Sequence, residues 1–274
     1  MKFFKYQALG NDYLILPGLA VETLTPDLVR QVCDRHFGLG SDGVLLPVSG
    51  SAGGVADFGL RIFNPDGSEA EKSGNGLRIF ARYLFDQGLV GHAPFTVWTA
   101  GGIVSCTLQA DGQILVGMGP VSFDSQRIPV LGPPRQVIEE ELHILGQVCK
   151  VTALTVGNPH CVVFAEQVSP DLARQWGPAL ECHPLFPNRT NVQFVQILDA
   201  HSIKIEIWER GAGYTLASGS SSCAAAAAAV RLGLCQPPVT VHMPGGSLWV
   251  GQEADGSLSL LGPAALVAWG ELAV

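Results

Sequence analysis

The second half of this 274-residue chain repeats the motifs of its first half in the same order. The matching pairs are Gly10–Asn11 with Gly157–Asn158, Phe63–Asn64 with Trp208–Glu209, and Ser73–Gly74 with Ser218–Gly219. Asn11 and Asn64 are 53 residues apart, and their counterparts are 51 apart. In both halves a Ser-Gly pair follows 9 residues after the second motif. Such self-similarity indicates a duplicated domain. The sequence predicts two similar halves, 1–120 and 121–274, whose special loops face each other, with a C-terminal segment that can pack on the first half.

Short apolar runs between Gly-containing turns predict strands in both halves. The clearest alternation is in 202–207, where every second residue is isoleucine. Helices are expected over Pro26–Phe37, Gly74–Gln87 and Ser220–Leu232, and the last is rich in alanine, the best helix former. Strands interspersed with helices indicate an α/β (α+β) fold. The Pro- and Gly-rich segment Pro120–Gln136 is the expected linker.

Composition narrows the class of protein and of partner. Hydrophobic residues make up 47% and charged residues 15%, which excludes a disordered chain. The formal net charge is −8 and no Lys/Arg cluster is present, so neither nucleic acid nor an anionic membrane is an expected partner. The longest apolar run, Cys223–Val230, is too short to span a bilayer. We expect a cytoplasmic protein.

Seven cysteines, an odd number, occur without any C-x-x-C pair. This pattern favours free, mostly buried thiols over a disulfide framework or a zinc site. The sequence thus points to no metal.

Two Gly- and Ser-rich loops each run into a predicted helix. They are Ser73-Gly74-Asn75-Gly76 and Ser218-Gly219-Ser220-Ser221. Free N–H groups at a helix N-terminus, together with the helix dipole, attract anions. Either loop alone is better explained as a capped helix. The two related loops together favour one anion held by both, and the absence of a P-loop argues against a nucleoside triphosphate.

The motifs around these loops resemble those of the diaminopimelate epimerase family. They are Phe63-Asn64-Pro65-Asp66-Gly67-Ser68-Glu69 with Ser73-Gly74-Asn75-Gly76-Leu77-Arg78, Glu209-Arg210-Gly211-Ala212-Gly213 with Ala217-Ser218-Gly219-Ser220-Ser221, and the shorter Gly10-Asn11-Asp12, Gly157-Asn158-Pro159-His160 and Asn191-Val192. The resemblance covers nearly the whole chain. It implies two pseudo-symmetric domains, each a sheet wrapped around a central helix.

The resemblance also implies an isomerase without pyridoxal or any other cofactor. One base removes the α-proton of an amino acid, and a second group delivers a proton to the opposite face. In this family the reaction interconverts LL- and meso-2,6-diaminopimelate for lysine and peptidoglycan synthesis. The partner is therefore a small amino acid, and family analogy allows a homodimer.

The family's site maps onto a defined set of residues in this chain. The acid/base positions are Ser73 and Ser218, with His160 and Glu209 as further catalytic candidates. The expected substrate-binding residues are Asn11, Asn64, Gly74, Asn75, Asn158, Asn191, Glu209, Arg210, Gly219 and Ser220. An arginine suits a carboxylate and a glutamate suits an ammonium group. Taken singly, each asparagine can also be a turn residue.

The chain departs from the family at the two acid/base positions, where the family has cysteine. A thiol ionises far more easily than an alcohol. Milder departures are Tyr214, where many members have Glu, and Gly43, where some have Gln. Three explanations remain open: an epimerase inactivated by exchange of both cysteines for serine, a hydroxy-amino-acid dehydratase, and a non-catalytic amino-acid-binding protein.

Overall fold

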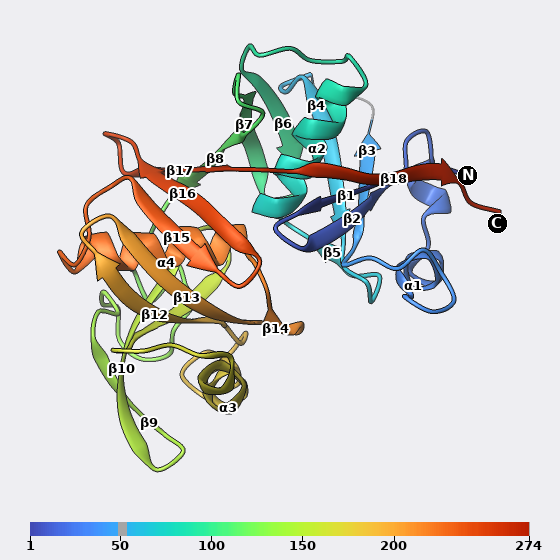
Figure 1. The fold of residues 1–274 in the computed structure, drawn as a ribbon. Coiled ribbons are helices and arrows are strands. Elements are labelled where there is room, and N and C mark those ends of the chain that lie inside the picture. Colours follow the sequence, from blue (N-terminus) through green and yellow to red (C-terminus); the bar gives the residue numbers. More distant parts are fainter. Residues whose placement is uncertain (49–53, 274) are drawn as a thin grey trace. The chain divides into compact units, whose positions relative to one another are not determined.

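The computed structural model describes residues 1–48 and 54–273. The chain forms two compact units (Figure 1). Unit 1 comprises Met1–Gly117 and Leu261–Val274, and unit 2 comprises Met118–Leu260. The last residues of the chain therefore belong to the same unit as the first, because strand β18 (Ala265–Glu271) pairs antiparallel with strand β1 (Lys2–Ala8).

Unit 1 is a mixed sheet with one long helix. Its other elements are β2 (Asn11–Ile15), the 3-10 helix η1 (Val21–Thr23), α1 (Pro26–Cys33), β3 (Val44–Val48), β4 (Phe58–Phe63), β5 (Glu69–Ala70), α2 (Gly74–Asp86), β6 (Phe95–Thr99), β7 (Gly102–Leu108) and β8 (Ile114–Pro120), which runs into unit 2. From β1 to β7 the successive pairings are antiparallel, parallel (β2–β3), antiparallel, parallel (β4–β6) and antiparallel, with β5 paired to β4.

Unit 2 repeats this order. Its elements are β9 (Glu140–Ile144), β10 (Gln147–Thr155), β11 (Pro159–Phe164), α3 (Pro170–Glu181), β12 (Asn191–Asp199), β13 (Ser202–Glu209), β14 (Gly213–Thr215), α4 (Gly219–Arg231), β15 (Val239–Met243), β16 (Gly246–Gln252) and β17 (Ser257–Gly262). From β10 to β16 the pairings are antiparallel, parallel (β11–β12), antiparallel, parallel (β13–β15) and antiparallel, with β14 paired to β13. The predicted α/β fold of duplicated domains is confirmed.

The long helix of each unit packs against the strands of its own sheet. Helix α2 contacts β1, β2 and β7, and helix α4 contacts β10, β11 and β12. Figure 1 shows α2 lying across the strands of unit 1. Helix α4 is buried along almost all of its length, which its run of alanines permits because small side chains let strands approach from several sides. The predicted central helix is thus present in both units.

Three details differ from the sequence predictions. Helix α1 ends at Cys33, before the expected Phe37, because the Asp34 carboxylate accepts the N–H groups of His36 and Phe37 and stabilises a turn. Helix α3 was not predicted, although Ser169 caps it and Pro170 opens it. The expected linker, Pro120–Gln136, is packed into unit 2, since Ile128 and Val130 are buried in its core.

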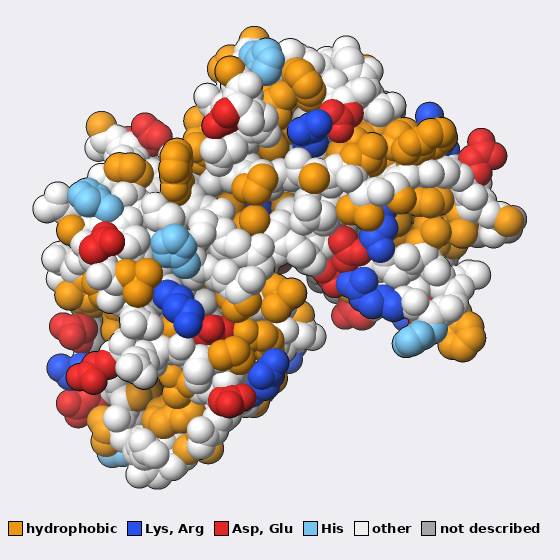
Figure 2. All heavy atoms as spheres, viewed as in Figure 1, with side chains coloured by type: hydrophobic (Ala, Val, Ile, Leu, Met, Phe, Trp, Pro, Cys, Tyr) orange, Lys and Arg blue, Asp and Glu red, His pale blue; other side chains and the backbone are white. Residues whose placement is uncertain are grey.

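Within the described residues, no helix is long and apolar enough to cross a membrane. On the visible face of unit 1, acidic and basic side chains lie next to one another (Figure 2). Five of the seven cysteines are buried, Cys149 is partly buried and Cys182 is exposed, and all seven are free thiols.

Candidate active site

Ser73 forms the N-cap of helix α2 in unit 1. Its backbone is extended, with φ −139° and ψ 118°, and its Oγ accepts a 3.0 Å hydrogen bond from the N–H of Gly76. A second side chain reaches the same oxygen, because Oη of Tyr13 lies 3.4 Å from it. The helix N-terminus supplies positive potential at this point.

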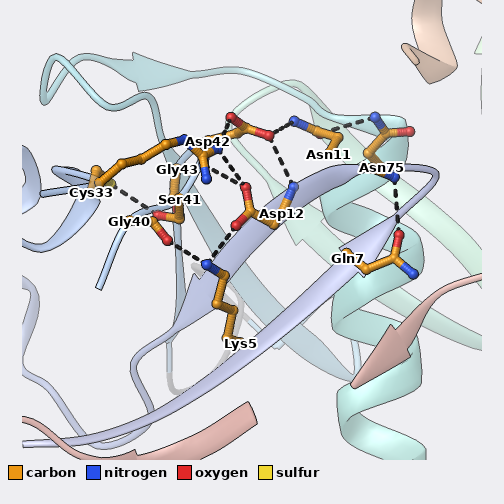
Figure 3. A network of polar contacts seen from close by, with 12 residues as sticks. Lys5, Gln7, Asn11, Asp12, Cys33, Gly40, Ser41, Asp42, Gly43 and Asn75 are labelled. Atoms are coloured by element: carbon orange, nitrogen blue, oxygen red, sulfur yellow. Dashed lines mark hydrogen bonds and ion pairs between the residues drawn. The ribbon is translucent and has the colours of Figure 1, made fainter. Parts of the chain in front are cut away.

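Asn75 and Asn11 are held together beside this helix end (Figure 3). Nδ2 of Asn75 donates to Oδ1 of Asn11 over 2.9 Å, and Nδ2 of Asn11 donates to Asp42 over 2.9 Å. Asp42 also accepts the backbone N–H of Asp12 over 3.0 Å. The structure therefore joins two predicted binding residues in one chain of hydrogen bonds that ends on Asp42.

Asp12 and Asp42 are connected by a shared cation. Nη2 of Arg35 lies 2.9 Å from an Asp12 oxygen and 2.7 Å from an Asp42 oxygen, and Nζ of Lys5 lies 2.8 Å from the other Asp12 oxygen. Burial raises the pKa of the Asp12 carboxyl, but hydrogen bonds from Lys5, Arg35 and Asp42 outweigh this effect and lower it overall. These ion pairs fix the β1–β2 hairpin against the loop that carries Asp42.

Arg78 is a fully buried cation on helix α2. Its guanidinium donates to Oδ1 of Asn75 over 2.8 Å, and to the carbonyl oxygens of Gly74 and Pro263 over 3.3 Å each. Arg78 thereby joins the Ser-Gly loop to the C-terminal segment of unit 1.

Asn64 is engaged in a turn in this structure. Its Nδ2 donates to Oγ of Ser68 over 3.0 Å, and its backbone N–H and carbonyl bond within the same loop. Asn11 and Asn75, by contrast, share a hydrogen bond at the start of helix α2.

Ser218 forms the N-cap of helix α4 in unit 2. Its φ of −148° and ψ of 125° closely match those of Ser73, and its Oγ accepts from the N–H of Ser221 over 3.4 Å. Oγ of Ser220 lies 3.5 Å from the same oxygen. Ser218 is 5% exposed, so its hydroxyl lies in a largely desolvated position.

A buried polar chain runs beside this second helix end. Nε2 of His160 is 2.8 Å from Oδ1 of Asn158, so this nitrogen carries the proton. Nε2 of Gln193 donates to Oγ of Ser221 over 3.0 Å. Within the described residues, Nδ1 of His160 and Oε1 of Gln193 are buried without an aligned hydrogen bond, although Gln193 lies near enough to affect the ring.

Burial lowers the pKa of His160 to about 3, with the nearby Arg210 charge acting in the same direction and Gln193 opposing it. The imidazole is therefore neutral near pH 7. A neutral ring can orient its neighbours through hydrogen bonds. It carries no extra proton to donate, and taking one up is unfavourable in this buried position. These properties favour a positioning function for His160 over that of a general acid.

Asn191 and Arg210 lie where strands β12 and β13 bring the two motifs together. Nδ2 of Asn191 donates to the Pro159 carbonyl over 2.9 Å, and its Oδ1 accepts the backbone N–H of Arg210 over 3.0 Å. The N–H donor and the oxygen acceptor of this buried amide thus both bond to backbone groups. The Arg210 guanidinium donates to the Asn188 carbonyl over 3.3 Å, and Glu209 ends strand β13 beside it.

The structure adds residues that are absent from the predicted set of catalytic and substrate-binding residues. Tyr13, Asp42, Arg78, Gln193 and Ser221 all contact predicted site residues directly. For Arg78 on a helix and Gln193 on a strand, the sequence does carry a signal. Each is a polar residue at a position where the apolar pattern of the element predicts burial. In the described part of the chain, no three His, Cys, Asp or Glu side chains are grouped as a metal site.

The chain matches known proteins over its whole length. The diaminopimelate epimerase family model matches residues 3–123 and 152–267. "Diaminopimelate epimerase 2" of Nostoc sp. is 53% identical over 99% of this chain and 95% of its own length. The diaminopimelate epimerase of Synechocystis sp. is 40% identical over 99% of this chain and 98% of its own.

Solved structures of low sequence identity share the fold. A probable proline racemase from Agrobacterium radiobacter aligns with a TM-score of 0.75 at 15% identity, covering 100% of this chain and 93% of that one. A PhzF-family phenazine biosynthesis protein from Bacillus anthracis aligns with a TM-score of 0.71 at 18% identity, covering 100% of this chain and 99% of that one.

The expected class, an isomerase, is confirmed by the relatives. With both halves matched by the family model and full-length identities of 40–53%, the chain belongs to the diaminopimelate epimerase family.

Proposed function

We propose that this protein acts on 2,6-diaminopimelate as an epimerase of the LL and meso forms, in lysine and peptidoglycan synthesis, with proton transfer slowed by serine at both acid/base positions. The observation that carries the proposal is the equivalence of Ser73 and Ser218. Each is the N-cap of the long helix of its unit, with the same extended backbone and the same hydrogen bond to the third helical N–H.

This placement supports a carboxylate-binding and proton-transferring function. The first N–H groups of a helix have no partner within the helix and favour an anion. Charge that develops on the substrate carboxylate as the α-proton leaves would be stabilised by such fixed donors. Proton removal and delivery would fall to the positions of Ser73 and Ser218, without a cofactor.

The remaining predicted residues would bind the rest of the substrate. Arg210 offers a guanidinium for a carboxylate, and Glu209 offers a carboxylate for an ammonium group. Asn11 and Asn158 would complete the contacts to the zwitterion. Asn191 would act through Arg210, whose backbone N–H it accepts.

A binding protein without catalysis is the second candidate. Both serine hydroxyls are already used as helix caps, and within the described residues neither bonds to a histidine or carboxylate side chain that would ionise it. The hydroxy-amino-acid dehydratase is the third, since it needs one base only. A cytoplasmic location and a homodimer stay predictions.

Calorimetry with diaminopimelate, followed by α-proton exchange in deuterated water, tests the proposal. We expect binding of diaminopimelate in preference to hydroxyproline and slow exchange at one centre. Arg210→Ala should weaken binding by about 1.5–3 kcal/mol, the range for a hydrogen bond to a charged group. Arg231→Ala, an exposed arginine of the same unit, is the matched control.

Binding without any exchange would favour the binding protein. Preference for a hydroxyproline, with loss of water from it, would favour the dehydratase. Absence of heat with diaminopimelate would contradict both the substrate assignment and the proposed function.

A further inference from the structure

Oη of Tyr13 lies at hydrogen-bond distance from Oγ of Ser73. The two oxygens are 3.4 Å apart, and Tyr13 is 7% exposed. Ser73 Oγ already accepts the N–H of Gly76. A hydroxyl has one donor proton and two lone pairs, so Ser73 retains both a proton and an acceptor site to share with Tyr13.

Gly43 makes room for the Tyr13 ring. A Cβ atom at position 43 would lie 2.7 Å from Cε1 and 3.1 Å from Cδ1 of Tyr13, and 2.5 Å from the Phe63 carbonyl oxygen. Contacts this short force the ring or the backbone to move. The Gly43 carbonyl is itself fixed, since it accepts from Leu14 N–H over 3.0 Å and from Ser41 Oγ over 2.9 Å. The absence of a side chain at 43 is therefore a condition for the contact between Tyr13 and Ser73.

The two hydroxyls differ in acidity. A phenol has an ordinary pKa of about 10, well below that of an aliphatic alcohol, so a proton shared between them leaves Tyr13 first. The N-terminus of α2 adds positive potential that favours a negative oxygen nearby. The pair thus offers an ionisable group at a position where the serine alone offers none.

We propose that Tyr13 is a positioning residue that serves as the proton partner of Ser73 in the reaction proposed above. In the forward direction Ser73 Oγ accepts the α-proton of the amino acid while its own proton passes to the Tyr13 phenolate, and the electron pair of the C–H bond remains on the substrate as an enolate-like carbanion. In the reverse direction Tyr13 returns a proton to Ser73 as Ser73 protonates the carbanion. Two protons move in each direction, the negative charge passes between Tyr13 and the substrate, and no oxidant or reductant is involved.

Tyr13→Phe removes Oη and leaves the ring in place. We expect the α-proton exchange rate of diaminopimelate to fall about 10²-fold or more, in the range of general acid–base catalysis, with KM nearly unchanged and the tyrosine-dependent limb of the pH profile lost. Tyr83→Phe is the control, because Tyr83 is equally buried in unit 1 and packs on Phe4. An unchanged rate and pH profile in Tyr13→Phe would overturn the proposal.

A second experiment needs no substrate. In Ser73→Cys, the pH dependence of iodoacetamide alkylation, followed on the peptide that contains position 73, reports the pKa of the introduced thiol. Adding Tyr13→Phe should raise that pKa by about 0.5–1 pH unit, because a hydrogen bond of ordinary strength to the thiolate is lost. Adding Tyr83→Phe should leave it unchanged.

The two experiments separate the two proposals, since this inference rests on the proposed function. If the wild type exchanges no α-proton but the alkylation shift is present, the proposed epimerase function fails while the contact between Tyr13 and position 73 stands. If exchange occurs and neither the rate nor the alkylation depends on Tyr13, the epimerase function stands and this inference is wrong.

Discussion

Nη2 of Arg78 donates a 2.8 Å hydrogen bond to Oδ1 of Asn75, one turn earlier on helix α2. Nδ2 of the same asparagine donates to Asn11. A cation without solvent exposure therefore fixes the orientation of an amide at the helix end, and this amide in turn fixes a residue of the β1–β2 turn.

Arg78→Met should destabilise unit 1 strongly. It removes the donor that Arg78 supplies to Oδ1 of the buried Asn75, and the loss of such a partner costs about 1–3 kcal/mol. Urea unfolding measures the loss. Arg82→Met on the same helix is the control, because its exposed pair with Asp86 is worth at most about 1 kcal/mol. Equal losses in the two variants would show that the buried hydrogen bonds of Arg78 add no more to stability than the exposed pair of Arg82.

Gln193→Leu should destabilise unit 2 by about 1–3 kcal/mol, since it leaves the buried Ser221 hydroxyl without a partner. Adding Ser221→Ala should recover part of this loss because both partners are then absent. The double-mutant cycle, measured by urea unfolding, should give a coupling energy of about 0.5–3 kcal/mol. Additive losses would contradict the hydrogen bond.

The lowered pKa of His160 predicts that the free energy of unfolding decreases in acid. Its pKa is about 3 in the folded protein against 6.5 as the ordinary value, so the unfolded chain binds the proton more readily. This contribution is complete above pH 6.5 and declines as the pH falls towards 3, by at most about 1.4 kcal/mol per pH unit. His160→Gln should show a shallower decline in the free energy of unfolding between these limits. His143→Gln, at an exposed position, should follow the wild type.

Asp42→Asn should weaken diaminopimelate binding through Asn11. The substitution removes the charge that accepts from Asn11 Nδ2 and pairs with Arg35, and a hydrogen bond to a charged group is worth about 1.5–3 kcal/mol. Calorimetry measures the affinity, and urea unfolding separates this loss from a loss of stability. Asp57→Asn in the same unit, whose carboxylate accepts hydrogen bonds from the N–H and the hydroxyl of Thr96, is the control. An affinity like that of the control would contradict the assignment of Asn11 as a substrate-binding residue.

Ser73→Cys combined with Ser218→Cys should restore rapid epimerisation, because thiols ionise near neutral pH at helix N-termini and alcohols do not. Each single variant should epimerise much more slowly, since the reaction needs a base on one face and an acid on the other. Solvent deuterium incorporation, read by mass spectrometry, follows both. A double variant that binds diaminopimelate but exchanges no proton would favour the binding protein.

The sequence alone determined the features that depend on neighbours along the chain. The duplication could be read from the spacing of Asn11, Asn64 and Ser73 against their counterparts, and both units show the same order of strand pairings. The helices that start after Ser73 and Ser218 were predictable because an N-cap serine satisfies N–H groups within its own turn.

The contacts between side chains distant in sequence depend on the tertiary structure. Tyr13 reaches Ser73 because strand β2 passes the start of α2 and Gly43 leaves space for the ring. Arg78 is buried rather than solvated because the C-terminal segment returns to unit 1 and offers the Pro263 carbonyl. Such pairings arise from the need to satisfy each buried polar group, and the groups that can do so are fixed by strand order, which the local sequence does not encode.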